Sequence, residues 1–260
     1  MTARSGGSGP PWRVLPLEVD APAALLDRGV ALLDGLTADP VPTLRWYRST
    51  STAVVLGRGQ APLVAGHSPD VEVLTRFSGG GAVLMDPSLL ALDVLLPTGH
   101  PWLDGDLGAV FPRVGRLWAD ALHDLGVDGA TVHDGPATAR RRGDARERLL
   151  AAVCYATLGR GEVLVGGRKI VGLAQRRRRP GALVQCGLLR RWDPAPLLAA
   201  LGGDPGDPVV LGAAVGLDEV LAGVAAARNR VPGGRVDDQA VMRAVTARAT
   251  APGGEPCRTS

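Results

Sequence analysis

Hydrophobic residues recur with helical spacing most clearly between residues 114 and 125. They fall there at i, i+3, i+4, i+7, i+8 and i+11, and Gly126 follows the last of them. This stripe predicts an amphipathic helix that ends at the glycine. His123 lies off the stripe, so we expect it to face solvent. Weaker patterns predict helices over 25–36, 194–201, 217–228 and 237–248, and a helix or loop over 143–153.

Short apolar and β-branched runs lie between these helices. They predict strands over 44–47, 53–56, 71–76, 82–85, 91–96, 162–165, 168–171 and 182–189. Strands and helices are interspersed without strict β-α-β alternation, and no internal repeat is visible. The pattern predicts one mixed α/β domain of the α+β type, whose single, largely antiparallel sheet is flanked by helices. We expect the domain to span residues 12–250, between disordered tails at 1–11 and 251–260.

The most regular pair of predicted strands forms a hairpin around Gly166 and Gly167. A two-residue glycine loop is typical of a tight hairpin, because both residues can take a positive φ. This register places Leu164 opposite Lys169, Val165 opposite Arg168, and Glu162 opposite Val171. Side chains alternate along a strand, so Glu162 and Lys169 share one face and lie within reach of each other. We expect Lys169 to face an open site and to contribute little to stability.

The composition limits the class of protein. Of the 260 residues, 45% are hydrophobic and 21% charged, which is too apolar for a disordered chain. No apolar run approaches the length of a membrane span, and the start of the chain has no signal-peptide core. An odd number of cysteines in such a chain favours free thiols, at Cys154, Cys186 and Cys257. We therefore expect a cytoplasmic protein that does not enter the membrane.

Almost all of the basic residues are arginines. The net charge is +3, and the 29 basic residues are 28 Arg and one Lys, Lys169. This one ammonium either reflects drift in composition or fills a site that needs a compact cation on a flexible stem. Four arginines at 176–179, predicted to lie in a loop, form a solvated turn or a docking patch for an acidic partner. No aromatic residue interleaves with them, so we expect no nucleic-acid binding.

Three further features can carry chemistry. A glycine triplet, Gly79–Gly81, follows Arg76 and Ser78 and lets the backbone approach an anion, although a flexible turn is the simpler explanation of the triplet alone. Cys154 precedes Lys169 by fifteen residues; a thiol near a cation is a candidate nucleophile, and a buried inert thiol is the alternative. The simplest role that we expect for Glu162 is a surface ion pair with Lys169. Cys186 lies inside a predicted strand, which favours a structural role.

Two strings together resemble a known family. They are Arg76-Phe77-Ser78-Gly79-Gly80-Gly81-Ala82-Val83 and Gly167-Arg168-Lys169-Ile170-Val171-Gly172-Leu173-Ala174-Gln175-Arg176, and they are similar to segments of the lipoate protein ligase and octanoyltransferase family. The resemblance spans roughly residues 44–189. It implies the biotin and lipoate synthetase fold, with Lys169 as the central catalytic residue. It also implies an acyl-binding site built from Arg76, Ser78, Gly79, Gly80, Gly81, Gly172 and Ala174.

The family resemblance implies one of two reactions. Transferases take an octanoyl or lipoyl group onto a cysteine as a thioester and pass it to a lysine of a lipoyl domain. Cys154, followed by Tyr155, resembles the nucleophile of that branch. Ligases instead form an acyl adenylate with ATP and Mg, using an Asn-Asp pair that is missing from residues 158–162. We expect a transferase without a cofactor; for a ligase, Glu162 becomes the candidate metal-binding residue.

The resemblance also implies partners and leaves alternatives open. The acceptor is a lipoyl-domain protein or a glycine-cleavage carrier protein, and the donor is an acyl carrier protein or free lipoate. Met85 stands where many members have histidine, which keeps a catalytically silent binding protein as an alternative. The glycine and arginine pattern at 56–60 is only faintly similar to a biotin-binding motif. Biotin ligation is therefore less favoured than lipoyl or octanoyl transfer, lipoate ligation or a silent binding protein.

Overall fold

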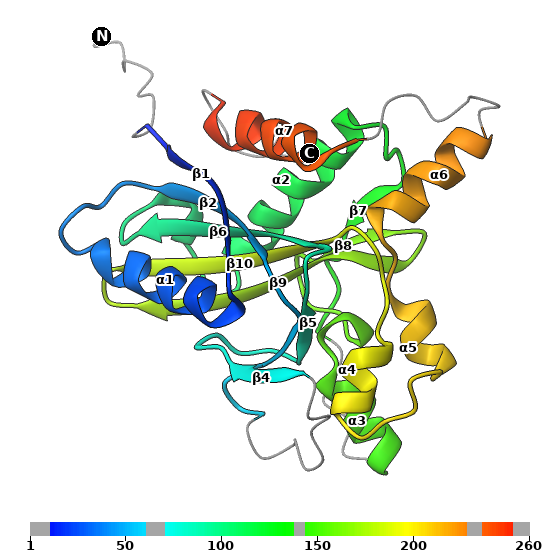
Figure 1. Ribbon diagram of the computed structural model, residues 1–260. Coiled ribbons are helices and arrows are strands. Elements are labelled where there is room, and N and C mark those ends of the chain that lie inside the picture. The colour runs from blue at the N-terminus through cyan, green and yellow to red at the C-terminus, as the bar shows by residue number, and fades with distance from the viewer. Residues whose placement is uncertain (1–10, 61–70, 138–143, 228–235, 252–260) are drawn as a thin grey trace, which may run out of the picture.

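The computed structural model describes residues 11–60, 71–137, 144–227 and 236–251 (Figure 1). A sheet of seven strands crosses the whole molecule in the order β1-β2-β6-β10-β9-β8-β7. Only β1 and β2 pair in parallel; the other neighbours are antiparallel. Its strands are β1 (Arg13–Asp20), β2 (Thr43–Ser49), β6 (Leu89–Pro97), β7 (Ala130–Val132), β8 (Val163–Val165), β9 (Arg168–Arg178) and β10 (Gly181–Leu189).

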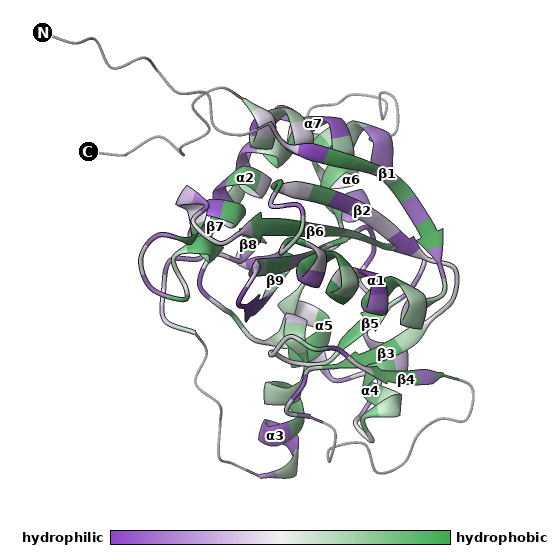
Figure 2. Cartoon of the chain, turned by 90° about the vertical axis from the view of Figure 1, so that its left-hand side faces the viewer, coloured by the Kyte–Doolittle hydropathy of each residue, from purple (hydrophilic) through white to green (hydrophobic). Residues whose placement is uncertain are grey.

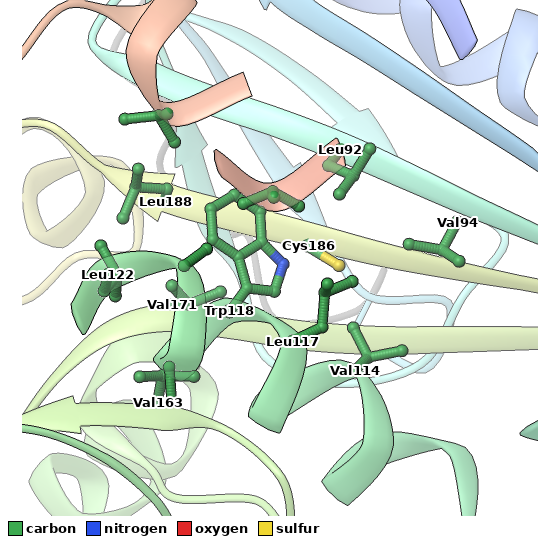
Figure 3. Packing of buried hydrophobic residues seen from close by; sticks show 14 of the residues in the cluster. Leu92, Val94, Val114, Leu117, Trp118, Leu122, Val163, Val171, Cys186 and Leu188 are labelled. Atoms are coloured by element: carbon green, nitrogen blue, oxygen red, sulfur yellow. The ribbon is translucent and has the colours of Figure 1, made fainter. Parts of the chain in front are cut away.

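The helices that flank this sheet pack on opposite faces. On one face α2 (Val110–Asp124) and α7 (Asp238–Thr250) cover a core centred on Trp118 (Figure 3). On the other face lies α1 (Pro22–Gly35), whose Leu33 packs against Leu95 and Leu183. Strand β6 is buried along its whole length and strongly hydrophobic, whereas the edge strand β1 alternates (Figure 2). Burial of a strand on both faces favours such a nearly apolar run, in which Asp93 is the one charged residue.

A second, smaller sheet lies below the first in Figure 1. It has the order β4-β3-β5, with β3 (Ala53–Leu56), β4 (Glu72–Thr75) and β5 (Val83–Met85). Two helices, α3 (Ala145–Ala152) and α4 (Ala195–Ala200), contribute to its core. The chain is completed by α5 (Pro208–Ala213) and α6 (Leu217–Ala227) and by the 3₁₀ turns η2 (Pro101–Leu103) and η3 (Cys154–Ala156).

The predicted architecture of a large mixed, largely antiparallel sheet flanked by helices is confirmed, with several corrections. Three of the predicted strands form the separate small sheet, and the pattern missed β1, β7 and α5. Strand β9 continues to Arg178, so most of the arginine block lies in a strand instead of a loop. Its pairing with the apolar β10 holds these charged residues extended. The predicted tails and Cys257 lie outside the described residues, apart from Pro11 and Ala251.

The hairpin between β8 and β9 has the predicted turn and a partly different register. Gly166 and Gly167 have positive φ values of 57° and 77°. Leu164 pairs with Lys169 as predicted, but Val163, and not Glu162, pairs with Val171. The reason is a β-bulge opposite the Val163–Leu164 step, which leaves Ile170 as one additional residue in β9.

None of the helices in the described ranges has the length and apolar character that crossing a bilayer requires.

Candidate active site

Cys154 begins a 3₁₀ turn that is attached to the glycine-rich segment. The backbone N–H of Cys154 donates to the carbonyl of Ala82 at 2.8 Å, and the N–H of Ala82 donates to the carbonyl of Ala152 at 2.6 Å. Ala82 and Val153 form an isolated parallel bridge. The turn that carries the thiol is therefore fixed to the chain immediately after the glycine triplet, although 72 positions separate the two in sequence (residue 82 to residue 154).

The three glycines of the triplet have different roles. A Cβ on Gly81 would lie 2.6 Å from the Cys154 nitrogen and 2.8 Å from its Cα, so any side chain there would push the two segments apart. Gly80 has φ +98°, which other residues rarely adopt. Gly79 has an ordinary φ and open space around it. The close backbone approach predicted for this triplet is thus an approach of Gly81 to Cys154.

Arg76 is a buried cation beside the thiol. Its side chain donates to the carbonyls of Gly79 and Gly81, both at 2.8 Å, and to that of Val55 at 3.3 Å. Its Nε has no hydrogen-bond partner among the described residues. Burial lowers the pKa of the Arg76 guanidinium, and the neighbouring Cys154 acts in the opposite direction. Arg76, and not Lys169 as predicted, is therefore the cation that lines the same pocket as the thiol.

An apolar pocket of about 500 Å³, including its open mouth, lies between the two sheets and α1. Cys154, Arg76, Gly172 and Ala174 line it, so four of the predicted site residues meet there. Ser78 and the triplet do not line it; Ser78 instead donates to Gln185 at 2.6 Å. Such a pocket suits an aliphatic chain with one polar end. Its apolar wall consists mainly of Leu26, Val55, Val83, Met85, Leu89 and Ala91.

Tyr155 forms the part of the pocket wall next to Cys154. Its hydroxyl donates to the carbonyl of Gly187 at 2.7 Å. A Cβ at Gly187 would lie 2.8 Å from that hydroxyl oxygen, and one at Gly172 would lie 3.2 Å from the ring. Burial raises the pKa of the Tyr155 hydroxyl well above its ordinary value, so the group stays neutral and donates. Gly172 thus provides space for the aromatic ring as well as lining the pocket.

Lys169 is buried behind the Cys154 turn. Only 1% of the residue is exposed. Its Nζ lies 2.6 Å from Glu162 Oε2 and donates to the carbonyl oxygen of Cys154 at 2.7 Å. It also lies 5.4 Å from the centre of the Tyr155 ring. The predicted pairing with Glu162 is confirmed, but the expected surface ion pair and open-facing lysine are wrong, because the 3₁₀ turn and the 157–162 segment cover the hairpin.

Glu162 does not fit the role of a metal ligand. Its Oε2 accepts from the backbone N–H of Gly159 at 2.6 Å in addition to the Lys169 ammonium. Its Oε1 accepts from the N–H of Leu173 at 3.3 Å. Both oxygens therefore already face hydrogen-bond donors, and the ammonium would repel a second cation. This donor set gives no support for Mg at Glu162.

Cys186 lines the same pocket but belongs to the hydrophobic core. It is 2% exposed and lies near Trp118 (Figure 3). Burial raises the pKa of its thiol to about 12, so the thiol stays protonated at neutral pH. The two pocket thiols therefore differ: Cys186 is enclosed, and Cys154 is partly exposed next to Arg76.

Three polar residues of this region were not predicted from the sequence. Tyr47 and Gln185 line the pocket, and Tyr155 supports it. Gln185 is the single polar side chain inside the apolar run 182–189, which was an available signal. Tyr47 follows Arg45 and Trp46 in a run with no comparable signal, since its role depends on the neighbouring strands.

Comparison with known proteins agrees with this geometry. A family model described as the lipoyl protein ligase A/B catalytic domain matches residues 26–208. The chain is 31% identical over 183 residues to the octanoyltransferase LipM of Moorella thermoacetica, which covers 68% of this chain and 63% of that protein. The chain therefore matches less than two thirds of the length of such curated relatives.

Two solved structures show the same fold. A candidate lipoate protein ligase from T. acidophilum has a TM-score of 0.58 at 20% identity, covering 92% of this chain and 85% of that chain. A bi-partite lipoate protein ligase of Thermoplasma acidophilum, studied with its E2 lipoyl domain, has a TM-score of 0.52 at 19% identity, covering 91% and 81%. With well over half of its residues matched by the family model, the chain belongs to the lipoyl protein ligase A/B catalytic domain family.

Proposed function

We propose that the protein is an acyltransferase that carries an octanoyl or lipoyl group on Cys154 and transfers it to a lysine of a lipoyl domain. One observation carries this proposal: a partly exposed thiol lies in the wall of an apolar pocket, beside the buried Arg76 cation. Cys186, the other thiol of the pocket, is enclosed in the core and stays protonated. Cys154 is therefore the nucleophile of choice.

The comparisons support the same class of substrate. Several relatives, including those from Moorella thermoacetica and Kyrpidia tusciae, are named octanoyltransferase LipM. A further T. acidophilum structure holds bound lipoic acid. Octanoyl and lipoyl groups share an aliphatic chain, which fits the apolar wall of the pocket. A transferase of this kind needs no cofactor.

The proposed reaction is a sequence of two acyl transfers. The Cys154 thiol gives up its proton as its sulfur attacks the carbonyl of an acyl thioester donor; the donor's carbon–sulfur bond breaks, and its sulfur leaves as a thiol that takes up one proton. The neutral amine of the acceptor lysine then attacks the Cys154 thioester, which forms an amide and releases the Cys154 thiol. Both steps exchange one acyl bond for another, so no oxidant, reductant or nucleotide is consumed.

Arg76 and Lys169 supply positive charge on two sides of the Cys154 residue. Arg76 interacts with the thiol side, and Lys169 holds the carbonyl of the same residue. Arg76 lines the pocket and can contribute positive charge there, whereas Lys169 lies outside the pocket lining and acts by holding the Cys154 backbone. Gly81 allows the Arg76 segment and the Cys154 turn to approach each other closely.

The experiment is intact-mass measurement after incubation with an octanoyl acyl carrier protein without ATP. We expect one octanoyl group on the protein, released by neutral hydroxylamine and absent in Cys154→Ser. Cys186→Ala is the matched control, because it removes the other pocket thiol and should keep the adduct. A second reaction with lipoate, ATP and Mg tests the ligase alternative.

The two reactions separate the candidate functions. Thioester formation on Cys154 without ATP supports the transferase. Full activity of Cys154→Ser that depends on ATP and Mg would make the protein a ligase. Failure of every donor with the wild-type protein would leave only the silent binding protein. The expected acceptor is a lipoyl domain, the partner present with the T. acidophilum ligase.

A further inference from the structure

Glu162 connects three segments around the proposed nucleophile. Its side chain is 6% exposed, and both carboxylate oxygens are used. One oxygen binds the Lys169 ammonium and the N–H of Gly159, and the other binds the N–H of Leu173. Leu173 lines the pocket, and Lys169 holds the carbonyl of Cys154. One carboxylate thus joins the covering segment, the lysine and the pocket wall.

The β-bulge explains why Glu162 can reach these partners. The ladder between β8 and β9 ends at the pairing of Val163 with Val171. The N–H of Leu173 lies two residues beyond that pairing and bonds to the Glu162 carboxylate instead of a strand carbonyl. The backbone N–H of Val215 donates to the carbonyl of Lys169 at 2.9 Å, which fixes the lysine backbone. The end of the lysine side chain is then fixed by Glu162 and Cys154.

A lysine side chain does not keep such a position by itself. It has four rotatable methylene groups, and its ammonium is strongly hydrated when it can reach water. Burial of the ammonium is favourable only while a charged partner stays close. At the Lys169 ammonium, Glu162 supplies the negative charge and Cys154 supplies a neutral carbonyl.

We infer that Glu162 is a positioning residue, which holds the Lys169 ammonium on the carbonyl of Cys154 and thereby sets the orientation of the proposed nucleophile. This inference rests on the proposed function of Cys154. Glu162 does not line the pocket, so it acts through Lys169 and not on the acyl group. The same contacts give the Glu162 carboxylate a role that does not involve a metal ion.

The first test does not require activity. Lys169 is the single lysine of the chain, so an amine reagent such as acetic anhydride reports on one side chain besides the N-terminus. We expect Lys169 to resist acetylation in the wild-type protein, measured by peptide mass. Glu162→Gln should speed this acetylation about 10-fold or more, because the unpaired lysine leaves its buried position. An unchanged rate in the folded variant would overturn the inference.

The second test measures single-turnover acylation of Cys154 from an octanoyl carrier donor. Glu162→Gln should lower the maximal rate by about 10- to 100-fold, the range for loss of a group that orients a functional residue. The apparent affinity for the donor should stay near the wild-type value, because the pocket wall keeps its side chains. Asp207→Asn is the matched control: Asp207 is also a buried carboxylate, paired with Arg146 away from the pocket lining. It should keep the wild-type rate.

A double-mutant cycle separates positioning from a loss of stability. The variant Glu162→Gln/Lys169→Met leaves no unpaired charge, so it should fold even where Glu162→Gln does not. If Glu162 acts through Lys169, the double variant should acylate at the rate of Lys169→Met alone. If the two substitutions instead act independently, so that their fold-reductions in acylation rate multiply in the double variant, the inference is overturned. Failure of the wild-type protein to form any thioester disproves the proposed function, and the acetylation test still decides the role of Glu162.

Discussion

Two buried ion pairs on the large sheet differ in what their cations hold in place. Lys169 and Glu162, 2.6 Å apart, lie behind the Cys154 turn. Arg45 and Asp93, 2.7 Å apart, lie beneath α1, where Gly29 leaves space for the carboxylate. In both pairs the side chains are 6% exposed or less.

The remaining contacts of the two cations differ. Those of Arg45 connect strands of the sheet, and that of Lys169 reaches the residue of the proposed nucleophile. Arg45 donates through Nε to Glu18 in β1, at 2.8 Å, and its guanidinium lies over the ring of Tyr47. These contacts connect three strands of the sheet and involve the pocket only through Tyr47. Lys169 uses its additional donor on the residue that carries the proposed nucleophile. Removing one partner of either buried pair should destabilise the fold, but only the Lys169 pair should control acyl transfer.

The largest effect is expected for Lys169→Ala. Loss of a preorganised positive group should lower acyl transfer by about 10²- to 10³-fold. The free energy of unfolding should also fall, by about 3–5 kcal/mol, because the Glu162 carboxylate stays buried without its partner. Denaturant unfolding and a transfer assay on one sample measure both quantities. Wild-type stability of this variant would contradict the buried pair, and wild-type transfer would contradict its role.

Arg45→Met should separate the two regions. It leaves Asp93 buried and unpaired, so we expect a similar loss of about 3–5 kcal/mol in the free energy of unfolding. Single-turnover acylation of Cys154, measured at a temperature where circular dichroism shows the folded state, should remain near the wild-type rate. A loss of acylation as large as that of Lys169→Ala would remove the distinction between the pairs.

Asp93 should make stability depend on pH. Burial raises the pKa of the Asp93 carboxyl from 3.8 to about 6, despite the opposing effect of Arg45. Between these values the folded state binds more protons than the unfolded state, so the free energy of unfolding should fall as the pH rises, by up to about 3 kcal/mol. Chemical unfolding of the wild-type protein at several pH values between 4 and 7, compared with Asp93→Asn, measures this term. Identical slopes for the two proteins would refute the assignment.

The glycine triplet offers the smallest and most local test. Gly81→Ala should cost about 1–3 kcal/mol, as overpacking does, because its Cβ would meet the Cys154 backbone. It should also slow acylation, since the turn must shift. Gly79→Ala is the matched control, with open space and an ordinary φ. The thermal stability and the acylation rate of Gly79→Ala should both stay close to the wild-type values. Equal effects of the substitutions at Gly79 and Gly81 would contradict the close approach of Gly81 to Cys154.

The periodic parts of the fold could be predicted from the sequence. The helix over 110–124 and the strands over 53–56 and 181–189 have strong apolar patterns, and the structure places them within a few residues of the prediction. Elements with weak patterns were missed. Strand β1 contains Pro16 and alternates with charged residues, and β7 has three residues. The six-residue α5 begins with the Asp207-Pro208 pair, a start signal that was present but not used.

The pocket residues could be predicted only in part. The motif gave Arg76, Cys154, Gly172 and Ala174, which all line the pocket. The sequence did not indicate that Lys169 is buried, because its cover comes from residues that the hairpin pattern does not include. It also did not indicate the β-bulge, which shifts the register of β8 and β9 by one residue. Burial of a polar group is a tertiary property, and strand alternation predicts only which face it occupies.

The most direct measurement is a chase of the isolated acyl-protein. The wild-type protein is loaded with octanoyl from a carrier donor, desalted, and mixed with a lipoyl domain without ATP or Mg. The account predicts that the octanoyl group leaves Cys154 and appears on the acceptor lysine at least as fast as steady-state turnover. A stable adduct on Cys154, with acceptor modification only when lipoate or octanoate, ATP and Mg are added, would contradict it.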